Sequence, residues 1–293
     1  MRGLSDITAG YLLGLTGVLI FAGTLPMTRV ALGGFDPMVI ACGRAALASL
    51  VAATALVLTR RRFPKDQVAW LLLAGLMLVF GFPGLSSLAM ITVPAAHGGV
   101  VLGILPLLTA AFAAWIGGER PGPVFWALSI LGAALVTAFT LFASDITPGI
   151  GDVWLLLAAL AAACGYVISG RLSRDLPGWE VIAWALVLTA PLSVTVTFLT
   201  VPTGIHDPTG PEWAALLYLA LGSMFGGFIF WNAGLARGGI ARVGQVQLLQ
   251  TFATLGISAL LLGERITPAM IGFACAVGAV VWAGRKARVT RSG

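Results

Sequence analysis

The sequence predicts an all-α integral membrane protein with ten transmembrane helices arranged as two inverted five-helix repeats. Three observations predict this fold. Hydrophobic residues make up 59% of the 293 residues and charged residues only 10%, whereas soluble domains have a charged share of about 25%. Apolar stretches of about 20 residues, long enough to cross a bilayer as a helix, recur along the whole chain. The third observation is an internal repeat that extends through a whole helix.

The apolar stretches and the turn-forming residues between them predict where each span begins and ends. The first stretch is longer than the core of a signal peptide and lacks a convincing small-residue cleavage site, so we expect it to be retained as a helix. The ten expected spans are residues 8–30, 37–59, 67–92, 95–116, 123–142, 152–170, 179–200, 212–235, 240–262 and 267–284.

The distribution of basic residues predicts the orientation of these spans. Most of the 17 Lys and Arg residues fall in segments on the same side as the N-terminus, including residues 60–65 and 285–291. The two longest segments expected on the other side, 143–152 and 201–212, contain no Lys or Arg. Because cytoplasmic loops are enriched in these residues, we expect a multi-pass protein of a bacterial-type inner (plasma) membrane with cytoplasmic N- and C-termini. The basic residues that give the chain its net charge of +6 are therefore explained by their role in orienting the helices. For this reason we expect no nucleic-acid partner.

The internal repeat divides the chain into two halves with the same number of transmembrane spans. The segment WIGGERPGP matches LLLGERITP at a shift of 145 residues, and the match extends upstream through the preceding helix. We therefore expect a first five-helix repeat at 1–143 and a second at 144–293, which together form one transport domain. An odd number of spans per half inverts the second half, as in many secondary transporters.

The repeat also places two acid–base pairs at opposite faces of the membrane. These are Glu119 with Arg120, and Glu264 with Arg265. Each pair could close a gate as an ion pair, or could simply cap a tight turn. The sequence leaves both interpretations open.

The segments DPMVIACGRAALA and PAAHGGVVLGILPLLTAAFAAWIGGER, in this order and spacing, resemble the drug/metabolite transporter superfamily, specifically its EamA-type exporters. The resemblance covers essentially the whole chain, and it includes Arg44 and Pro106. It implies a substrate cavity at the interface of the repeats, in a family whose bacterial members often export amino acids, including aromatic ones. In the second half Thr251 stands where the first half has Pro106, which departs from the family pattern.

The charged residues narrow the expected cargo. No acidic residue falls deep within a span, and the first helix lacks the Glu on which related cationic-drug antiporters depend, so proton-coupled export of bulky cations is not expected. Arg44 is the one cationic side chain that lies well inside an expected span, away from its ends, which is too few for a phosphate clamp. With bulky cations and phosphates excluded, the expected cargo is a neutral or zwitterionic molecule.

Polar and aromatic residues within the spans are the candidate substrate-binding residues. On the ninth span a polar stripe shares one helix face and should point into the bundle; it consists of Gln247, Gln250, Thr251 and Thr254. The other candidates are Arg44, Ser86, Ser87, His97, Tyr166, Trp231 and Asn232.

Each of these residues also has a structural interpretation. Arg44 could bind a substrate carboxylate or helix carbonyls, and His97 could titrate near neutral pH or be a satisfied structural residue. The aromatic residues Tyr166 and Trp231 could stack on substrate or anchor the helices at the membrane interface. Ser86 and Ser87 follow a GFPG break, and a second break is expected around Pro26.

We therefore expect a secondary transporter that exports neutral or aromatic amino acids and related small metabolites by alternating access. The alternative is an exporter of small drugs or other organic metabolites with the same fold. Direct ATP drive is not expected, because there is no phosphate-binding loop. An enzyme, such as a hydrolase that uses Ser86 or Ser87 with His97, is not expected, because there is no GxSxG elbow and no carboxylate within the membrane to orient His97 as a base. The helix breaks favour a carrier over a channel. We expect neither a cofactor nor a metal. The expected partners are a small-molecule substrate and membrane lipid. Ten helices suffice to enclose a cavity, so the protein could function as a monomer.

Overall fold

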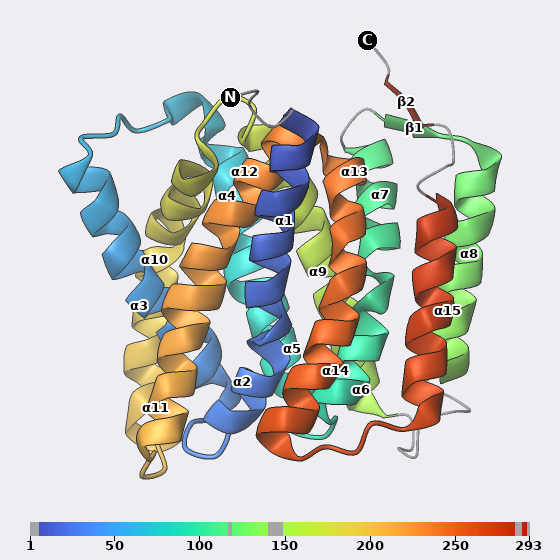
Figure 1. Ribbon diagram of the computed structural model, residues 1–293. Helices are drawn as coiled ribbons and strands as arrows, with labels where there is room; N and C mark the ends of the chain where they lie inside the picture. Colours follow the sequence, from blue (N-terminus) through green and yellow to red (C-terminus); the bar gives the residue numbers. More distant parts are fainter. Residues whose placement is uncertain (1–5, 117–118, 140–148, 285–288, 292–293) are drawn as a thin grey trace, which may run out of the picture.

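The computed structural model is a bundle of helices that run side by side between two faces (Figure 1). It describes residues 6–116, 119–139, 149–284 and 289–291. The start of α1 (Asp6–Ala22) and the strand β2 (Val289–Arg291) lie on the same side, which we call the terminal face. We call the opposite side the distal face. At the terminal face β2 pairs antiparallel with β1 (Glu119–Pro121).

Among the described residues, eight helical segments are long and apolar enough to cross a membrane. They are Thr8–Ala31, Pro37–Leu58, Lys65–Ala89, Ala95–Trp115, Ile150–Leu172, Gly178–Gly204, Gly210–Gly238 and Gln245–Leu262. The two other expected spans coincide with shorter helices, α8 (Pro123–Ala138, 16 residues) and α15 (Pro268–Gly284, 17 residues). The chain is therefore a multi-pass membrane protein.

The first span is broken near Pro26, as the sequence predicts. Helix α1 ends at Ala22, and α2 (Thr24–Ala31) begins after Gly23. Proline has no N–H group and therefore cannot donate to the carbonyl four residues earlier. Here that carbonyl belongs to Ala22, so the break leaves one buried acceptor that needs a donor from another helix.

Two spans contain π-helical segments. In the third span, η1 (Lys65–Gln67) and α4 (Val68–Gly75) lead into the π-helix η2 (Leu76–Gly81), which is followed by α5 (Phe82–Ala89). In the eighth span, α11 (Gly210–Leu217) leads into the π-helix η5 (Tyr218–Gly227) and then α12 (Phe228–Gly238). The expected break at GFPG is thus a widened helical turn followed by Pro83 at the start of α5. Such π segments often occur at functional sites.

The fourth and ninth spans each tighten to a short 3₁₀ turn. The fourth consists of α6 (Ala95–Val101), η3 (Leu102–Ile104) and α7 (Leu105–Trp115). The ninth consists of α13 (Ile240–Gly244), η6 (Gln245–Gln247) and α14 (Leu248–Leu262). The remaining spans are the regular helices α3 (Pro37–Leu58), α9 (Ile150–Leu172) and α10 (Gly178–Gly204).

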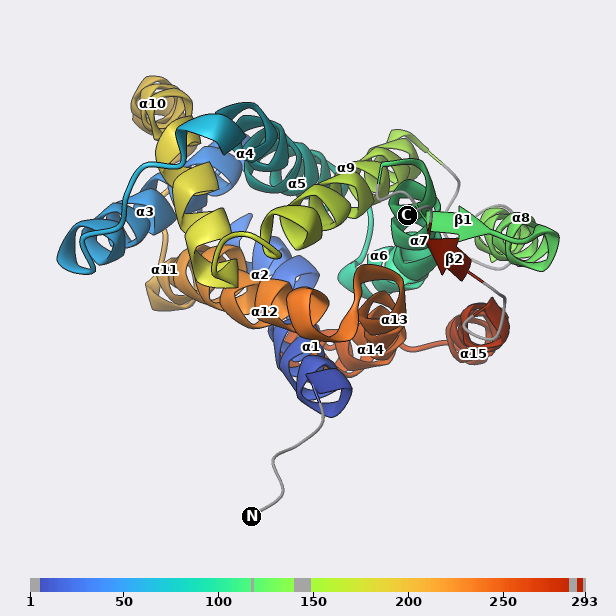
Figure 2. The same cartoon turned by 90° about the horizontal axis from the view of Figure 1, so that it is seen from above.

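The helices pack in pairs that join the first half of the chain to the second. Helix α3 packs on α10, α1 on α12, α5 on α9, and α6 on α14. The pair of α8 and α15 stands at one side of the bundle, next to α7 (Figure 2). Large apolar side chains such as Trp115 and Leu260 are exposed on the outside, as expected for surface that faces lipid.

Helices α1 and α12 approach each other at backbone distance. A Cβ atom at Gly10 would lie 2.7 Å from the backbone N of Gly238, and one at Gly234 would lie 2.7 Å from the backbone N of Gly14. Small residues permit this close approach between membrane helices. The two helices are therefore in direct main-chain contact.

Candidate transport site

The polar stripe on the ninth span is buried and faces the fourth span. Thr254 lies against Gly99, because a Cβ atom added to Gly99 would be 2.8 Å from the Cγ2 atom of Thr254. Thr251 lies against Gly103 in the same way, with its Oγ1 at 3.2 Å. Gln247 accepts a hydrogen bond of 3.5 Å from Thr109 through Oε1. The stripe therefore runs along the contact between the two halves of the chain.

The members of the stripe differ in how well their polar groups are paired. Thr254 donates a hydrogen bond of 3.0 Å to the Ala22 carbonyl, the acceptor that the break at Pro26 leaves free. The Nε2 of Gln247 and the Oε1 of Gln250 are buried and have no partner among the described residues. A buried polar group without a partner is costly. The glutamines can therefore bind a ligand or water, while Thr254 has a structural partner.

Tyr166 and Trp231 are buried next to each other. Their ring centroids are 5.3 Å apart, and Phe21 and Phe228 complete an aromatic cluster with centroid distances of 4.9 to 6.2 Å. Trp231 is fully buried, and its indole Nε1 has no partner among the described atoms. An aromatic cluster with a free donor can stack on an apolar ligand and donate to it. Sequence reasoning missed Phe21 and Phe228, because a phenylalanine within an apolar span carries no distinguishing signal.

Arg44 is a buried cation with incomplete hydrogen bonding. Only 2% of its surface is exposed. Its Nη2 donates a hydrogen bond of 3.2 Å to the Ser223 hydroxyl, which shares a 2.8 Å hydrogen bond with the Thr24 hydroxyl. Its Nε and Nη1 have no partner among the described residues. A guanidinium group in this state is suited to bind a carboxylate in bidentate fashion.

The hydroxyl groups near the Arg44 guanidinium and two rings of the aromatic cluster belong to the same two spans, the first and the eighth. Thr24 follows Phe21 by three residues at the α1–α2 break, and Ser223 precedes Phe228 by five residues in the π-helical region. One helical turn advances by about 5.4 Å. The hydroxyl groups of Thr24 and Ser223 therefore lie about one turn from Phe21 and Phe228, on the distal side of these two residues.

Asn232 has a structural partner for each of its polar groups. Its Oδ1 accepts a hydrogen bond of 2.6 Å from Ser169, and its Nδ2 donates one of 3.0 Å to the Gly178 carbonyl. It thus joins α12 to α9 and to the start of α10. Ser86 donates to the Pro83 carbonyl at 3.2 Å, whereas the buried Ser87 hydroxyl has no partner among the described atoms.

His97 has a carboxylate partner, so the expectation that no carboxylate could orient it was wrong. Its Nε2 lies 2.7 Å from Oδ1 of Asp152, and the two side chains are 0% and 8% exposed. Asp152 does lie at a helix end, in the first turn of α9, where its Oδ2 accepts a hydrogen bond from the Gly149 N–H. The sequence did not indicate that this helix end is buried against the start of α6.

The structure describes the side chains of one of the two gate pairs. Glu264 accepts hydrogen bonds of 2.9 and 2.7 Å from the N–H groups of Ala95 and Ala96, so it caps helix α6. Its neighbour Arg265 is exposed, and no ion pair between the two is found in the described part of the chain. The backbone of Glu119 and Arg120 forms β1, and their side chains lie outside the described residues.

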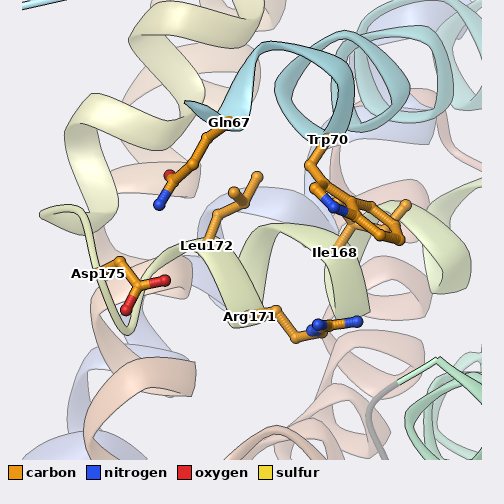
Figure 3. Close-up of a pocket in the computed structure, with 6 residues that line it drawn as sticks. All are labelled: Gln67, Trp70, Ile168, Arg171, Leu172 and Asp175. Carbon is orange, nitrogen blue, oxygen red and sulfur yellow. The ribbon is translucent and has the colours of Figure 1, made fainter. Parts of the chain in front are cut away.

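A pocket of about 180 Å³ lies between the start of α4 and the end of α9 (Figure 3). It is lined by Gln67, Trp70, Ile168, Arg171, Leu172 and Asp175. Arg171 lies over the Trp70 ring at 5.2 Å and donates a hydrogen bond of 2.8 Å to the Ile116 carbonyl. This pocket is near the terminal face and includes none of the sequence-predicted site residues.

A family model described as the EamA-like transporter family matches the chain twice, over residues 8–143 and 149–285. The chain is similar to an uncharacterized transporter, YdeK, of Bacillus subtilis (strain 168), with 41% identity over 97% of this chain and 99% of that protein. It is 28% identical to the aromatic amino acid exporter YddG of Ancylobacter novellus, over 92% of this chain and 91% of the exporter.

Among solved structures, one crystal structure superposes with a TM-score of 0.70 at 25% identity. The superposition covers 96% of this chain and 99% of the other. The similarity in sequence and in structure therefore extends over nearly the full length of the chain.

Proposed function

The chain belongs to the EamA-like transporter family, and we propose that it is a secondary transporter that exports neutral or aromatic amino acids and related small metabolites by alternating access. The observation that carries the proposal is the buried guanidinium of Arg44, with two unpartnered donors, about one turn from Phe21 and Phe228 of the aromatic cluster that also contains Trp231. An amino acid presents a carboxylate to such a cation and an apolar side chain to such rings. The similarity to an aromatic amino acid exporter supports this cargo class.

We also propose ten spans in two inverted repeats, with α8 and α15 as the fifth and tenth. The support is a regular set of correspondences between the halves. The third and eighth spans each contain a π-helix, and the fourth and ninth each contain a 3₁₀ turn. The packing of α1 on α12 corresponds to that of α9 on α5. In addition, α2 ends and α9 begins at the distal face, so the first helices of the two halves run in opposite directions.

In the proposed orientation the terminal face is cytoplasmic. The support is the basic character of the segments on that face, such as residues 60–65, together with the absence of Lys and Arg from residues 201–212 on the distal face. The protein would then be a multi-pass protein of a bacterial-type inner membrane, active as a monomer and in contact with lipid. Reaction of single exposed cysteines with an impermeant thiol reagent on intact cells tests this orientation.

The proposed mechanism needs no covalent chemistry. A zwitterion enters from the terminal face, its carboxylate occupies the free donors of Arg44, and its side chain packs on Tyr166 and Trp231. The free amide groups of Gln247 and Gln250 supply further hydrogen bonds from the ninth span. Because each half contributes to these contacts, rocking of one half against the other would open the site alternately to the two faces.

The test is counterflow of labelled L-phenylalanine and L-leucine in proteoliposomes. Arg44→Gln removes the charge, and we expect the initial rate to fall by more than about tenfold, since loss of a buried charge pair typically costs 2 kcal/mol or more. Phenethylamine, which lacks the carboxylate, should not compete with L-phenylalanine. Arg174→Gln, which changes an exposed arginine, is the matched control and should transport normally.

Wild-type rates for a folded Arg44→Gln variant would rule out the carboxylate contact. If wild-type protein transports neither amino acid but exports dyes or other organic metabolites, the drug/metabolite alternative replaces the amino acid assignment. That alternative uses the same aromatic cluster without a role for Arg44.

A further inference from the structure

A buried histidine–aspartate pair joins the two halves of the chain at the distal face. His97 lies in the first turn of α6, Asp152 in the first turn of α9, and the atoms Nε2 and Oδ1 are 2.7 Å apart. All residues from Ala95 to Val101 are buried, so the distal end of α6 is enclosed in this conformation. The Nδ1 atom of His97 is buried and has no partner among the described atoms.

Among the residues that the structure describes, few other ionisable groups lie near this pair. Helix α9 contributes Asp152, the segment after α14 contributes Glu264, and α2 contributes Arg29, which donates to the carbonyls at the end of α5. Helix α14 and η3 carry no Asp, Glu, His, Lys or Arg, and α15 has only the exposed thiol of Cys275. Since Glu264 and Arg29 are engaged with backbone groups, Asp152 is the carboxylate that faces the imidazole.

The chemistry of the pair allows it to bind one proton. In the neutral tautomer whose Nε2–H donates to Asp152, Nδ1 carries a free lone pair that can accept a proton. Protonation turns the contact into an imidazolium–carboxylate ion pair, and the attraction is strengthened by the low dielectric of the buried site. A proton on His97 therefore strengthens the contact that holds α6 against α9.

We propose that the His97–Asp152 pair is the proton-binding site of an antiport in which a proton entering from the distal side is exchanged for exported cargo. This inference rests on the proposed carrier function. Proton binding at Nδ1 favours the closed distal end seen here. Release of that proton towards the terminal face weakens the α6–α9 contact and lets the cargo-loaded carrier open distally.

The polar stripe on the ninth span provides a route between the pair and the terminal face. Thr254 lies against Gly99, two residues after His97, and Thr251 and Gln247 follow at successive turns. The free Nε2 of Gln247 can hold water next to this row. Hydroxyl, amide and water groups in a row can pass a proton where no carboxylate is present.

The first measurement is uptake of labelled L-phenylalanine into proteoliposomes that are acidic inside, with the membrane potential clamped to zero. For exchange of one proton for one zwitterion, a difference of one pH unit supports an accumulation of about tenfold. Asp152→Asn removes the charge but keeps an acceptor for His97. We expect this variant to lose the pH-driven accumulation while exchange without a pH gradient continues, and His97→Gln to lose the accumulation as well.

The chain contains a matched control pair. His206 and Asp36 are 3.1 Å apart at the distal face, but their side chains are 58% and 52% exposed. We expect His206→Gln and Asp36→Asn to keep the full accumulation. The proposal is overturned if Asp152→Asn accumulates cargo like the wild type, or if wild-type protein exchanges cargo but shows no pH-driven accumulation.

A second measurement does not depend on the cargo. The chain has only two histidines, so ¹⁵N-histidine NMR of the reconstituted protein, assigned with His206→Gln, follows His97 directly. We expect the spectrum to show both ring nitrogens of His97 carrying a proton when the proton site is loaded, and Asp152→Asn to abolish that doubly protonated state. If no amino acid is exchanged, the cargo assignment fails, and this NMR measurement alone decides the proton site. A His97 imidazole that stays neutral in acidified proteoliposomes refutes the proton site.

Discussion

Thr254 donates a 3.0 Å hydrogen bond to the carbonyl of Ala22, the group that Pro26 leaves without an amide donor. The two residues are 232 positions apart in the sequence. The polar stripe on the ninth span therefore has a structural role at one end, where it completes the broken first span. Its glutamines, with free polar atoms, are the part of the stripe that remains available to a ligand.

The first prediction concerns this hydrogen bond. Thr254→Val keeps the shape of the side chain but leaves the Ala22 carbonyl unpaired, and an unsatisfied buried acceptor costs about 1–3 kcal/mol. We expect a lower midpoint of unfolding in detergent, with Thr254→Ser close to wild type. Thr16→Val removes a hydroxyl bonded to its own helix at an exposed position and is the control. Equal stability of Thr254→Val and wild type would contradict this role.

The second prediction concerns the cap of α6. Glu264 accepts two backbone hydrogen bonds at the positive end of that helix. Glu264→Ala should destabilise the protein by about 1 kcal/mol, in the range for a lost N-terminal cap. Glu264→Gln should retain part of the effect, and Arg265→Ala should have little. Thermal unfolding in detergent measures all three. An equal loss for Glu264→Ala and Arg265→Ala would instead support an ion-pair gate.

The third prediction concerns the main-chain contact between α1 and α12. A Cβ atom at Gly234 would lie 2.7 Å from the backbone N of Gly14, and backbone atoms cannot move aside as a flexible side chain can. We expect Gly234→Ala to lower the yield of folded protein and its unfolding midpoint. Gly256→Ala, with nothing within 4 Å of the added Cβ atom, should be neutral or slightly stabilising. Size-exclusion chromatography and thermal unfolding separate the two outcomes.

The fourth prediction concerns the indole of Trp231. Its Nε1 has no partner among the described residues, although the ring is fully buried. Trp231→Phe keeps an aromatic ring in the cluster but removes the donor, so we expect weaker cargo binding without a large loss of stability. The KM for L-phenylalanine in proteoliposomes should rise several-fold. An unchanged KM would show that the indole N–H does not contact cargo.

Much of the helical arrangement could be predicted from the sequence, because apolar length and turn residues determine where a span begins and ends. The break near Pro26 was also predictable, since proline lacks a donor. The π-helices η2 and η5 were not, because a widened turn leaves the hydrophobic pattern unchanged. Helices α8 and α15 begin within one residue of the expected starts at 123 and 267.

The candidate site was harder to predict, because its features depend on contacts between distant residues. Burial of the polar stripe follows from its spacing on one helix face. The partner of His97 does not, since Asp152 lies 55 residues away and in the first turn of its helix. The connection between Arg44 and Ser223 spans 179 residues, and only the three-dimensional packing shows that it lies near the aromatic cluster.

The glycine contact between α1 and α12 also limits how the molecule can deform. Where two backbones touch, there is no layer of side chains that can change rotamer to absorb sliding, so the two helices should move as one rigid body. Bending is then confined to positions where the helical hydrogen bonds are already altered, such as Gly23 and the π turns of η5. Both positions adjoin the residues that contact Arg44. A small change in the angle between the helices would therefore first change the geometry of the site where the cargo is expected to bind.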